Sequence, residues 1–350
     1  MKIGFVLGTR PEVLKLGLVF NEIERLSPGI STIIDTQQQT TLKNMALIDL
    51  KLKSHIVIKH NLDFNLTQNL SYMQVELDKI LDNSGFQCLI VQGDTLSAFA
   101  GAIAAFYKKI PVIHIEAGLR SNCLNHPFPE EAHRRMLSSI TELHFAPNSQ
   151  AELQLQSEGI NKDKIILAGN PLLDIEYHNT DKTKDIDIII TLHRRENHTK
   201  AQSILQEIVK TAYKFPHYKF LIIKHTHPNI VLAIDKISKH APENIVISDA
   251  LSHPVFIKHL RKCRLVLTDS GGVQEEAAYW NIPTIILRKV SDRPDGIKLG
   301  LTSVLGNDLK NMNKLITKQL ISIPEAHSAP IQNNASTLIA KHIIKFIQNK

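Results

Sequence analysis

Residues 88–121 read CLIVQGDTLSAFAGAIAAFYKKIPVIHIEAGLRS, and their apolar pattern indicates the class of fold. Cys88–Gly93 and Val112–Glu116 are almost continuous apolar runs, which predict strands. Between them, Ser97–Tyr107 carries apolar residues at helical spacing, which predicts a helix. Near-continuous apolar strands separated by helices are typical of a parallel sheet that is covered on both faces.

Segments of the same two kinds alternate along the chain on either side of the polar stretch His178–Lys184. Before it, the predicted strands are Lys2–Gly8, Ser31–Thr36, His55–Lys59, Cys88–Gly93, Val112–Glu116 and Leu143–Pro147. After it, they are Ile186–Thr191, Phe220–His225, Ile245–Ser248, Leu265–Thr268 and Thr284–Leu287. We therefore predict an α/β protein with two doubly wound domains, residues 1–170 and 171–335, and a linker near residues 170–184.

A terminal helix is predicted at Ser336–Ile347, because Leu338, Ile339, Ile343 and Ile347 recur on one helical face. That apolar face must pack against one of the domains. The periodicity leaves open whether residues 336–350 return to the first domain.

The composition of the 350 residues excludes several classes of protein. Hydrophobic residues make up 43%, which is ample for packed cores. Three cysteines without a CxxC pair argue against a disulfide scaffold or a zinc ribbon. The longest apolar stretch is half a membrane span, and the first residues lack the pattern of a signal peptide. We expect a soluble, cytoplasmic protein without membrane contacts.

The net charge of +7 is spread over scattered basic residues, with no run of five or more. A nucleic-acid-binding protein would carry a basic stripe with interleaved aromatic residues, which are 5% of this chain. We expect no nucleic-acid partner, because the charge is more typical of an enzyme that handles anions.

Three carboxylates lie where ligands bind in open α/β sheets, beyond the strand ends. Asp94 and Glu116 follow predicted strands, and Glu130 begins a helix four residues before Arg134. The simpler structural interpretations are a helix N-cap for Asp94, a pair with Arg120 for Glu116 and a surface ion pair for Glu130. Together the carboxylates predict a cluster in which crowding separates acid and base roles.

Gly8-Thr9-Arg10-Pro11-Glu12, with Lys15 beyond it, stands at the end of the first predicted strand. The helix dipole disfavours a cation at a helix N-terminus unless an anion is shared there. The motif fits an anion site at Arg10 and Lys15 as well as it fits a turn with a solvated arginine.

Two motifs of the second half follow predicted strands. His193 with its neighbouring arginines suits an anion or proton-transfer site, the alternative being nonspecific surface basicity.

The segment Thr268–Glu276 joins a strand end to a helix through Ser270, Gly271 and Gly272. This pattern predicts a diphosphate cradle, with Glu276 reaching a ribose diol. The alternative is an N-cap that serves packing. Without a Walker A or GxGxxG pattern, ATPase and nicotinamide chemistry lose their main support.

Six motifs in this order resemble the UDP-N-acetylglucosamine 2-epimerase family, and they cover nearly the whole chain. They are GTRPEVLKL (8–16), VQGDTLSAFAGAIAAFYKKIPVIHIEAGLRS (91–121), PFPEEAHRRM (127–136), LHFAPN (143–148), HRREN (193–197) and TDSGGVQEEA (268–277). The resemblance implies two Rossmann-like domains in a GT-B-type arrangement, with a UDP-sugar in the interdomain cleft, and commonly a homodimer. It implies no metal and no nicotinamide or other cofactor.

The resemblance also implies roles for particular residues. Asp94, Glu116 and Glu130 match the catalytic carboxylates, with Arg134 beside them and His193 as the catalytic histidine. Substrate binding is implied for Arg10, Lys15, Ser270, Gly271, Gly272 and Glu276. The implied reaction abstracts the proton at sugar C2 while UDP leaves, giving 2-acetamidoglucal, and re-addition of UDP gives the epimer. The residues do not assign which carboxylate is the base.

Several positions depart from the family pattern, among them Gln37-Gln38-Gln39, the loop Ser291–Asp295, Leu192 and Leu301. The GDT, EAGLR and PEE segments resemble the non-hydrolysing branch, which interconverts UDP-GlcNAc and UDP-ManNAc for cell-surface polysaccharides. The alternatives are a hydrolysing 2-epimerase that releases ManNAc and UDP, an epimerase of a modified UDP-sugar, and, more remotely, a GT-B glycosyltransferase.

Overall fold

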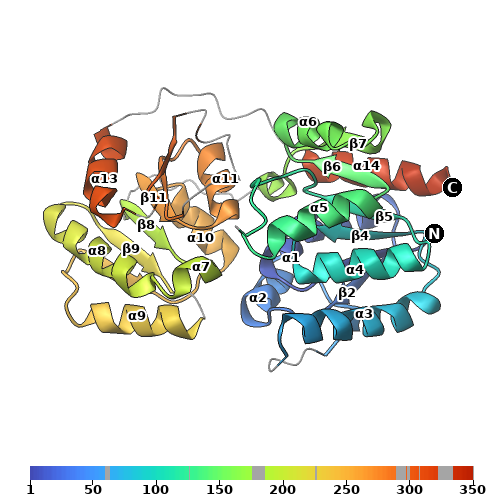
Figure 1. The fold of residues 1–350 in the computed structure, drawn as a ribbon, viewed down its shortest axis with the longest axis horizontal. Helices are drawn as coiled ribbons and strands as arrows, with labels where there is room; N and C mark the ends of the chain where they lie inside the picture. The colour runs from blue at the N-terminus through green and yellow to red at the C-terminus, as the bar shows by residue number, and fades with distance from the viewer. Residues whose placement is uncertain are drawn as a thin grey trace. The chain divides into compact units, whose positions relative to one another are not determined.

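The computed structural model describes residues 1–59, 64–125, 127–175, 186–224, 227–288, 297, 300–306, 308–321 and 334–349. The chain separates into two compact units, Met1–Glu176 with Gln332–Lys350, and Tyr177–Ile331 (Figure 1). Across the described ranges, no helix has both the length and the apolar character that a membrane span requires.

The first unit is built on a seven-stranded parallel sheet in the order β3-β2-β1-β4-β5-β6-β7. Its strands are β1 (Ile3–Leu7), β2 (Ser31–Asp35), β3 (Ile56–Val57), β4 (Cys88–Gln92), β5 (Val112–Ile115), β6 (Leu143–Ala146) and β7 (Ile165–Leu167). Its helices are α1 (Arg10–Leu26), α2 (Thr41–Asp49), α3 (Leu66–Asp82), α4 (Leu96–Tyr107), α5 (Glu130–Ile140), α6 (Ser149–Ser157) and α14 (Ala335–Gln348), with short 3-10 turns at Lys162–Lys164 and Pro171–Asp174.

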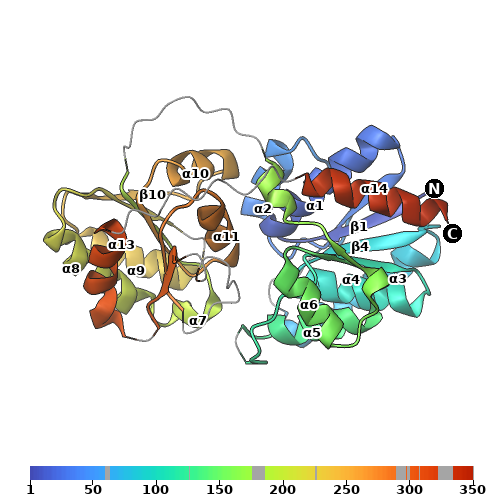
Figure 2. The same cartoon turned by 90° about the horizontal axis from the view of Figure 1, so that it is seen from above.

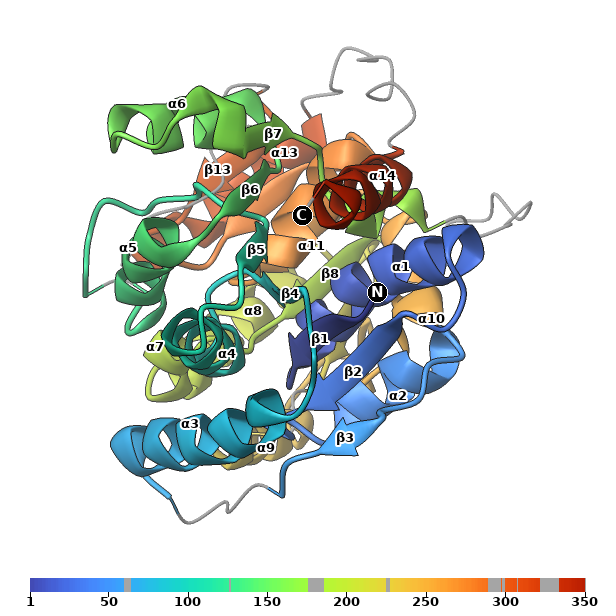
Figure 3. The same ribbon diagram turned by 90° about the vertical axis from the view of Figure 1, so that its right-hand side faces the viewer.

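Helices cover both faces of this sheet. Figure 3 shows α3, α4 and α5 on one face and α1, α2 and α14 on the other. Phe5 of β1 is buried on the α1 face and Val6 on the α4 face, because neighbouring strand residues point to opposite sides. This is why the strands read as continuous apolar runs.

The second unit contains a six-stranded parallel sheet in the order β10-β9-β8-β11-β12-β13. Its strands are β8 (Ile188–Thr191), β9 (Phe220–Ile223), β10 (Ile245–Ser248), β11 (Leu265–Thr268), β12 (Thr284–Ile286) and β13 (Thr302–Val304). Its helices are α7 (Arg195–His198), α8 (Ala201–Lys214), α9 (Pro228–Ser238), α10 (His253–Leu260), α11 (Gly271–Tyr279) and α13 (Met312–Ile321), with a 3-10 turn at Leu309–Asn311. Helices α8, α9 and α13 pack on one face, and α10 and α11 on the other.

The predicted α/β class with two doubly wound sheets is confirmed. Two strands were not predicted, β7 and β13, which are three-residue strands at sheet edges. Each is partly exposed, so neither carries the continuous apolar run of a central strand. The predicted polar linker falls largely on residues 176–185, which lie outside the described ranges.

The terminal helix α14 packs against α1 of the first unit, and Figure 2 shows the two helices side by side. Ile339, Ile343 and Ile347 of α14 are buried in the core on that face of the sheet. The backbone amide of Ser336 donates a hydrogen bond to Asp174 at 2.6 Å, which satisfies part of the helix N-terminus. The last segment of the chain therefore completes the first unit.

Candidate active site

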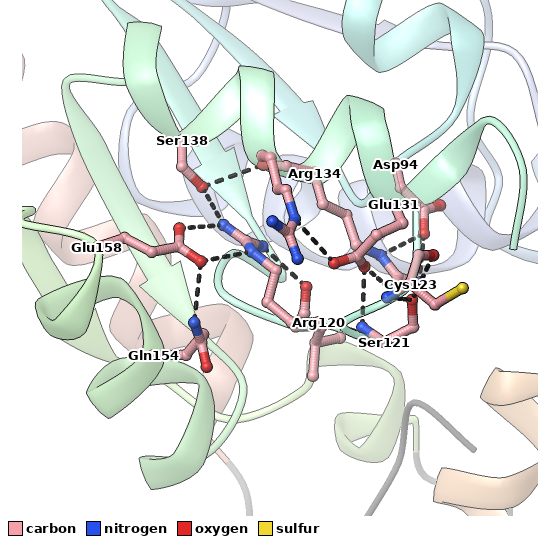
Figure 4. Close-up of polar contacts among 11 residues, drawn as sticks. Asp94, Arg120, Ser121, Cys123, Glu131, Arg134, Ser138, Gln154 and Glu158 are labelled. Carbon is pink, nitrogen blue, oxygen red and sulfur yellow. Dashed lines mark hydrogen bonds and ion pairs between the residues drawn. The ribbon is translucent and has the colours of Figure 1, made fainter. Parts of the chain in front are cut away.

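Asp94 lies in the loop after β4 and is held by a buried arginine. Nε and Nη2 of Arg134 lie 2.7 and 2.6 Å from Oδ2 of Asp94, and Figure 4 labels both residues. Arg134 is 4% exposed, so the interpretation of a surface ion pair is wrong for this arginine. The N-cap of α4 is Thr95, so the N-cap interpretation of Asp94 is also wrong.

Two buried histidines hold the backbone that carries Asp94. Nε2 of His114 lies 2.7 Å from the carbonyl oxygen of Gly93, and Nδ1 of His133 lies 2.9 Å from that of Asp94. Burial lowers the pKa of His114 to about 4 and also lowers the pKa of His133. Both rings are therefore neutral hydrogen-bond donors at neutral pH, and they fix the loop without adding charge beside the carboxylate.

Glu116 follows β5 and forms a buried ion pair with Lys15 of α1, while Gln92 of β4 donates a hydrogen bond to the same oxygen. Its φ of +64° is unusual for a residue with a side chain and is typical of functional sites. Pairing with Arg120 is wrong, because Nε of Arg120 binds Glu158 at 2.8 Å (Figure 4). Lys15, which the sequence predicts as a substrate-binding residue, therefore pairs with Glu116, a candidate catalytic residue.

Glu130 and Glu131 stand together in the first turn of α5. Glu130 is partly buried. Glu131, which the sequence did not single out, is fully buried and accepts from the Ser121 amide at 2.9 Å and from Nη1 of Arg134 at 3.5 Å. The sequence could have indicated this contact, because Glu131 precedes Arg134 by three residues and residues three apart share a helix face.

The loop of Arg10 is joined to the loop of Asp94 through Glu12, another residue that the sequence did not assign. The carboxylate of Glu12 accepts from the amides of Gly8 and Thr9 at 2.9 and 2.7 Å and from Oγ1 of Thr95 at 2.5 Å. Burial raises its pKa to about 7, against the effect of these hydrogen bonds. Arg10, the first residue of α1, is half-buried beside this network.

His193 of the second unit lies in the loop after β8 and is bound by Asp269, which follows β11. Oδ1 of Asp269 lies 3.0 Å from Nδ1 of His193 and accepts its backbone amide at 3.0 Å. Asp269 is completely buried, whereas the His193 side chain is 33% exposed. The sequence singled out the histidine but not the aspartate.

Ser270 is the N-cap of α11, and its Oγ accepts from the Val273 amide at 3.4 Å. Gly271 and Gly272 form the first turn of the helix. Among the described residues, a Cβ added to Gly272 would meet only Ser270 Oγ, at 4.0 Å. Backbone amides at an open helix N-terminus suit an anion such as a phosphate.

Glu276 lies on the second turn of α11 and is 4% exposed. Nε2 of His253, the first residue of α10, lies 2.5 Å from its carboxylate. The structure therefore places Glu276 against a histidine that the sequence did not single out.

The predicted site residues thus form two groups, and each group lies within one unit. Asp94, Glu116, Glu130 and Arg134 lie in the first unit with Arg10 and Lys15, and His193, Ser270, Gly271, Gly272 and Glu276 lie in the second. The described residues include no group of three or more His, Cys, Asp or Glu side chains able to hold a metal ion.

Comparison with known proteins gives a consistent result. The family model of UDP-N-acetylglucosamine 2-epimerase matches residues 22–344. The UDP-N-acetylglucosamine 2-epimerase of Neisseria meningitidis serogroup A is 33% identical, with coverage of 99% of this chain and 100% of the relative.

Solved structures agree. The crystal structure of UDP-GlcNAc 2-epimerase from Neisseria meningitidis bound to UDP-GlcNAc has a TM-score of 0.90 at 29% identity, covering 99% of this chain and 100% of that one. The Methanocaldococcus jannaschii UDP-GlcNAc 2-epimerase in complex with UDP-GlcNAc and UDP has a TM-score of 0.87 at 27% identity, with the same coverage. The chain belongs to the UDP-N-acetylglucosamine 2-epimerase family.

Proposed function

We propose that the protein is a non-hydrolysing UDP-N-acetylglucosamine 2-epimerase that interconverts UDP-GlcNAc and UDP-ManNAc. Family membership over nearly the full chain supports epimerase activity. The GDT, EAGLR and PEE segments support the non-hydrolysing branch, because they resemble that branch more than the hydrolysing one. The product would supply a cell-surface polysaccharide.

The carboxylates of the first unit would transfer the protons at C2 of the sugar. That proton is not acidic, so its removal needs a positioned base, and inversion needs a second group on the opposite face. The observation that carries the proposal is that Asp94 and Glu116 follow adjacent parallel strands, each bound by a buried cation. Glu130 is the third candidate for these roles.

The second unit would hold the UDP that leaves. Breaking the anomeric C–O bond places negative charge on the diphosphate, which the amides at the Ser270-Gly271-Gly272 turn and His193 would stabilise. Glu276 would contact the ribose, and Arg10 of the first unit would share the diphosphate.

Two half-reactions complete the epimerisation. In the first, the base takes the C2 proton, the C–H electron pair forms the C1–C2 double bond, and the C1–O electrons leave with UDP. In the second, UDP adds back to C1 of the 2-acetamidoglucal while C2 is protonated from the other face. All proton transfers in this scheme use acid–base groups of the chain.

Product analysis by phosphorus and proton NMR tests the proposal. Purified protein incubated with UDP-GlcNAc should produce UDP-ManNAc, with UDP far below the stoichiometric amount. UDP and ManNAc in equal amounts would contradict the non-hydrolysing assignment and select the hydrolysing branch. Conversion that needs an acceptor sugar would contradict epimerisation and indicate a glycosyltransferase.

We also propose a homodimer, which the family resemblance implies, in the cytoplasm, which the composition of the chain favours. Light scattering should give about twice the mass of one chain. The mass of a single chain at micromolar concentration would contradict the dimer.

A further inference from the structure

Asp269 contacts the backbone of the His193 loop as well as the His193 ring. Besides the ring and amide of His193, Oδ2 of Asp269 accepts from the backbone amide of Arg194 at 3.1 Å. The Asn197 side-chain nitrogen also donates to Oδ2, at 2.8 Å, and to the carbonyl oxygen of Leu287, at 2.8 Å. One buried carboxylate therefore fixes both the backbone and the ring of the histidine.

The charge of Asp269 persists despite its burial. Burial opposes ionisation of the carboxyl, but the interaction with His193 and the converging hydrogen bonds outweigh it and lower the pKa of Asp269 to about 2. An anion 3.0 Å from Nδ1 requires a proton on that nitrogen, because two facing lone pairs would repel each other. Nδ1 is thereby committed to Asp269, and a proton exchanged with substrate would pass through Nε2.

The same segment connects the histidine to the predicted diphosphate cradle. Asp269 directly precedes Ser270, the N-cap of α11. Oγ1 of Thr191 and Oγ1 of Thr268 lie 2.6 Å apart, and the Ser270 amide donates to Thr268 at 3.0 Å. These contacts join the ends of β8 and β11, so the His193 loop and the α11 N-terminus are held as one assembly.

We propose that Asp269 is the positioning residue of His193, holding the ring with its proton on Nδ1 and Nε2 as the nitrogen that serves the departing diphosphate. The assignment of the diphosphate rests on the proposed function, whereas the tautomer does not. Asp269 acts through the histidine and touches no substrate. Its part resembles that of the buried aspartates that orient histidines in hydrolytic triads.

Other charged or titratable side chains lie near Asp269 and His193, and their titration must be distinguished from that of the pair. Nε2 of His198 lies 3.2 Å from the carbonyl oxygen of His193, and the His198 ring lies against the ring of His227 with centroids 3.6 Å apart. Arg194 follows His193 directly in the chain. A pH profile of activity would combine these groups, so each ring must be observed individually.

Nitrogen-15 NMR of the ring-labelled full-length protein, without substrate, tests the inference. The His193 signals are assigned by their loss in His193→Gln. We expect the neutral ring to carry its proton on Nδ1. In Asp269→Asn this preference should weaken and the Nε2-protonated tautomer should appear, because the anion beside Nδ1 is lost.

Asn197→Ser is the matched control, because it removes a donor from the same carboxylate and keeps the charge. Its neutral ring should keep the proton on Nδ1, and its kcat against pH should keep the wild-type shape. In Asp269→Asn, kcat should fall by at least about 10²-fold. Equal behaviour of the two variants would reduce Asp269 to a structural role.

The wild-type tautomer gives a result even if Asp269→Asn fails to fold. A proton on Nε2 of neutral His193 would overturn the inference. Absence of UDP-GlcNAc turnover with an Nδ1-protonated ring would instead refute the proposed function and leave the hold of Asp269 on His193 intact.

Discussion

Replacing Glu12 by Gln should remove a pH dependence of stability that the wild-type chain carries. The carboxyl is fully buried, and burial raises its pKa from 4.5 to about 7. Below about pH 4.5 both the folded and the unfolded chain keep the proton, and the stabilisation is complete. As the pH rises toward 7 only the unfolded chain releases it, so the free energy of unfolding falls.

The size of the effect follows from the same values. A rise of the pKa from 4.5 to about 7 corresponds to a loss of about 3 kcal/mol between pH 4.5 and pH 8, at about 1.4 kcal/mol per pH unit. Gln fits the protonated form, because its oxygen accepts from the Gly8 and Thr9 amides and its nitrogen donates to Thr95. The variant should therefore lose little stability over this range.

Urea unfolding followed by circular dichroism at about pH 5 and pH 8 measures the difference. Trp280, the single tryptophan, lies in the second unit, so its fluorescence reports that unit as an internal control. Glu22→Gln on the same helix is the matched control variant. The Arg25 hydrogen bond lowers the pKa of Glu22 from its ordinary value of 4.5, so Glu22 stays ionised between pH 5 and pH 8. The same loss of stability from pH 5 to pH 8 in wild type and Glu12→Gln would refute the reasoning.

Four further predictions concern the site and the fold. Asp94→Asn and Glu116→Gln should each lower kcat by at least about 10²-fold and leave UDP affinity intact, since acid–base groups act in the transition state; near-normal rates would remove them from catalysis. Ser270→Ala should weaken UDP binding in calorimetric titration, and unchanged affinity would argue against the cradle. Lys15→Met should lower the free energy of unfolding by about 3–5 kcal/mol, because the buried Glu116 carboxylate loses its ion pair with Lys15; an unchanged urea midpoint would contradict this. Ile343→Ala should cost about 2–5 kcal/mol in the first unit, and no change would show that α14 is not needed for its core.

Much of the fold was predictable because central parallel strands must be apolar on both faces. The same logic found Asp94, Glu116 and His193, since polar residues directly after such strands stand out. The edge strands β7 and β13 were missed because three partly exposed residues leave no period to detect.

The partners of the charged residues were not predictable in this way. Arg120 follows Glu116 by four residues, yet it binds Glu158, while Glu116 pairs with Lys15, which precedes it by 101 residues. Such choices depend on which loops meet at the sheet edge, and local spacing does not contain that information. Asp269 was quoted within a glycine-rich motif, but its role emerged only when β8 and β11 proved to be neighbours.

The proposed function requires that the chain removes and replaces the proton at C2 of a UDP-sugar. Incubation with UDP-GlcNAc in D₂O, followed by proton NMR of the recovered nucleotide sugars, tests it most directly. We expect deuterium at C2 of the UDP-ManNAc formed, at a rate lowered at least about 10²-fold in Asp94→Asn. Formation of UDP-ManNAc that retains the original C2 hydrogen would contradict it, because epimerisation would then proceed without exchange of that proton.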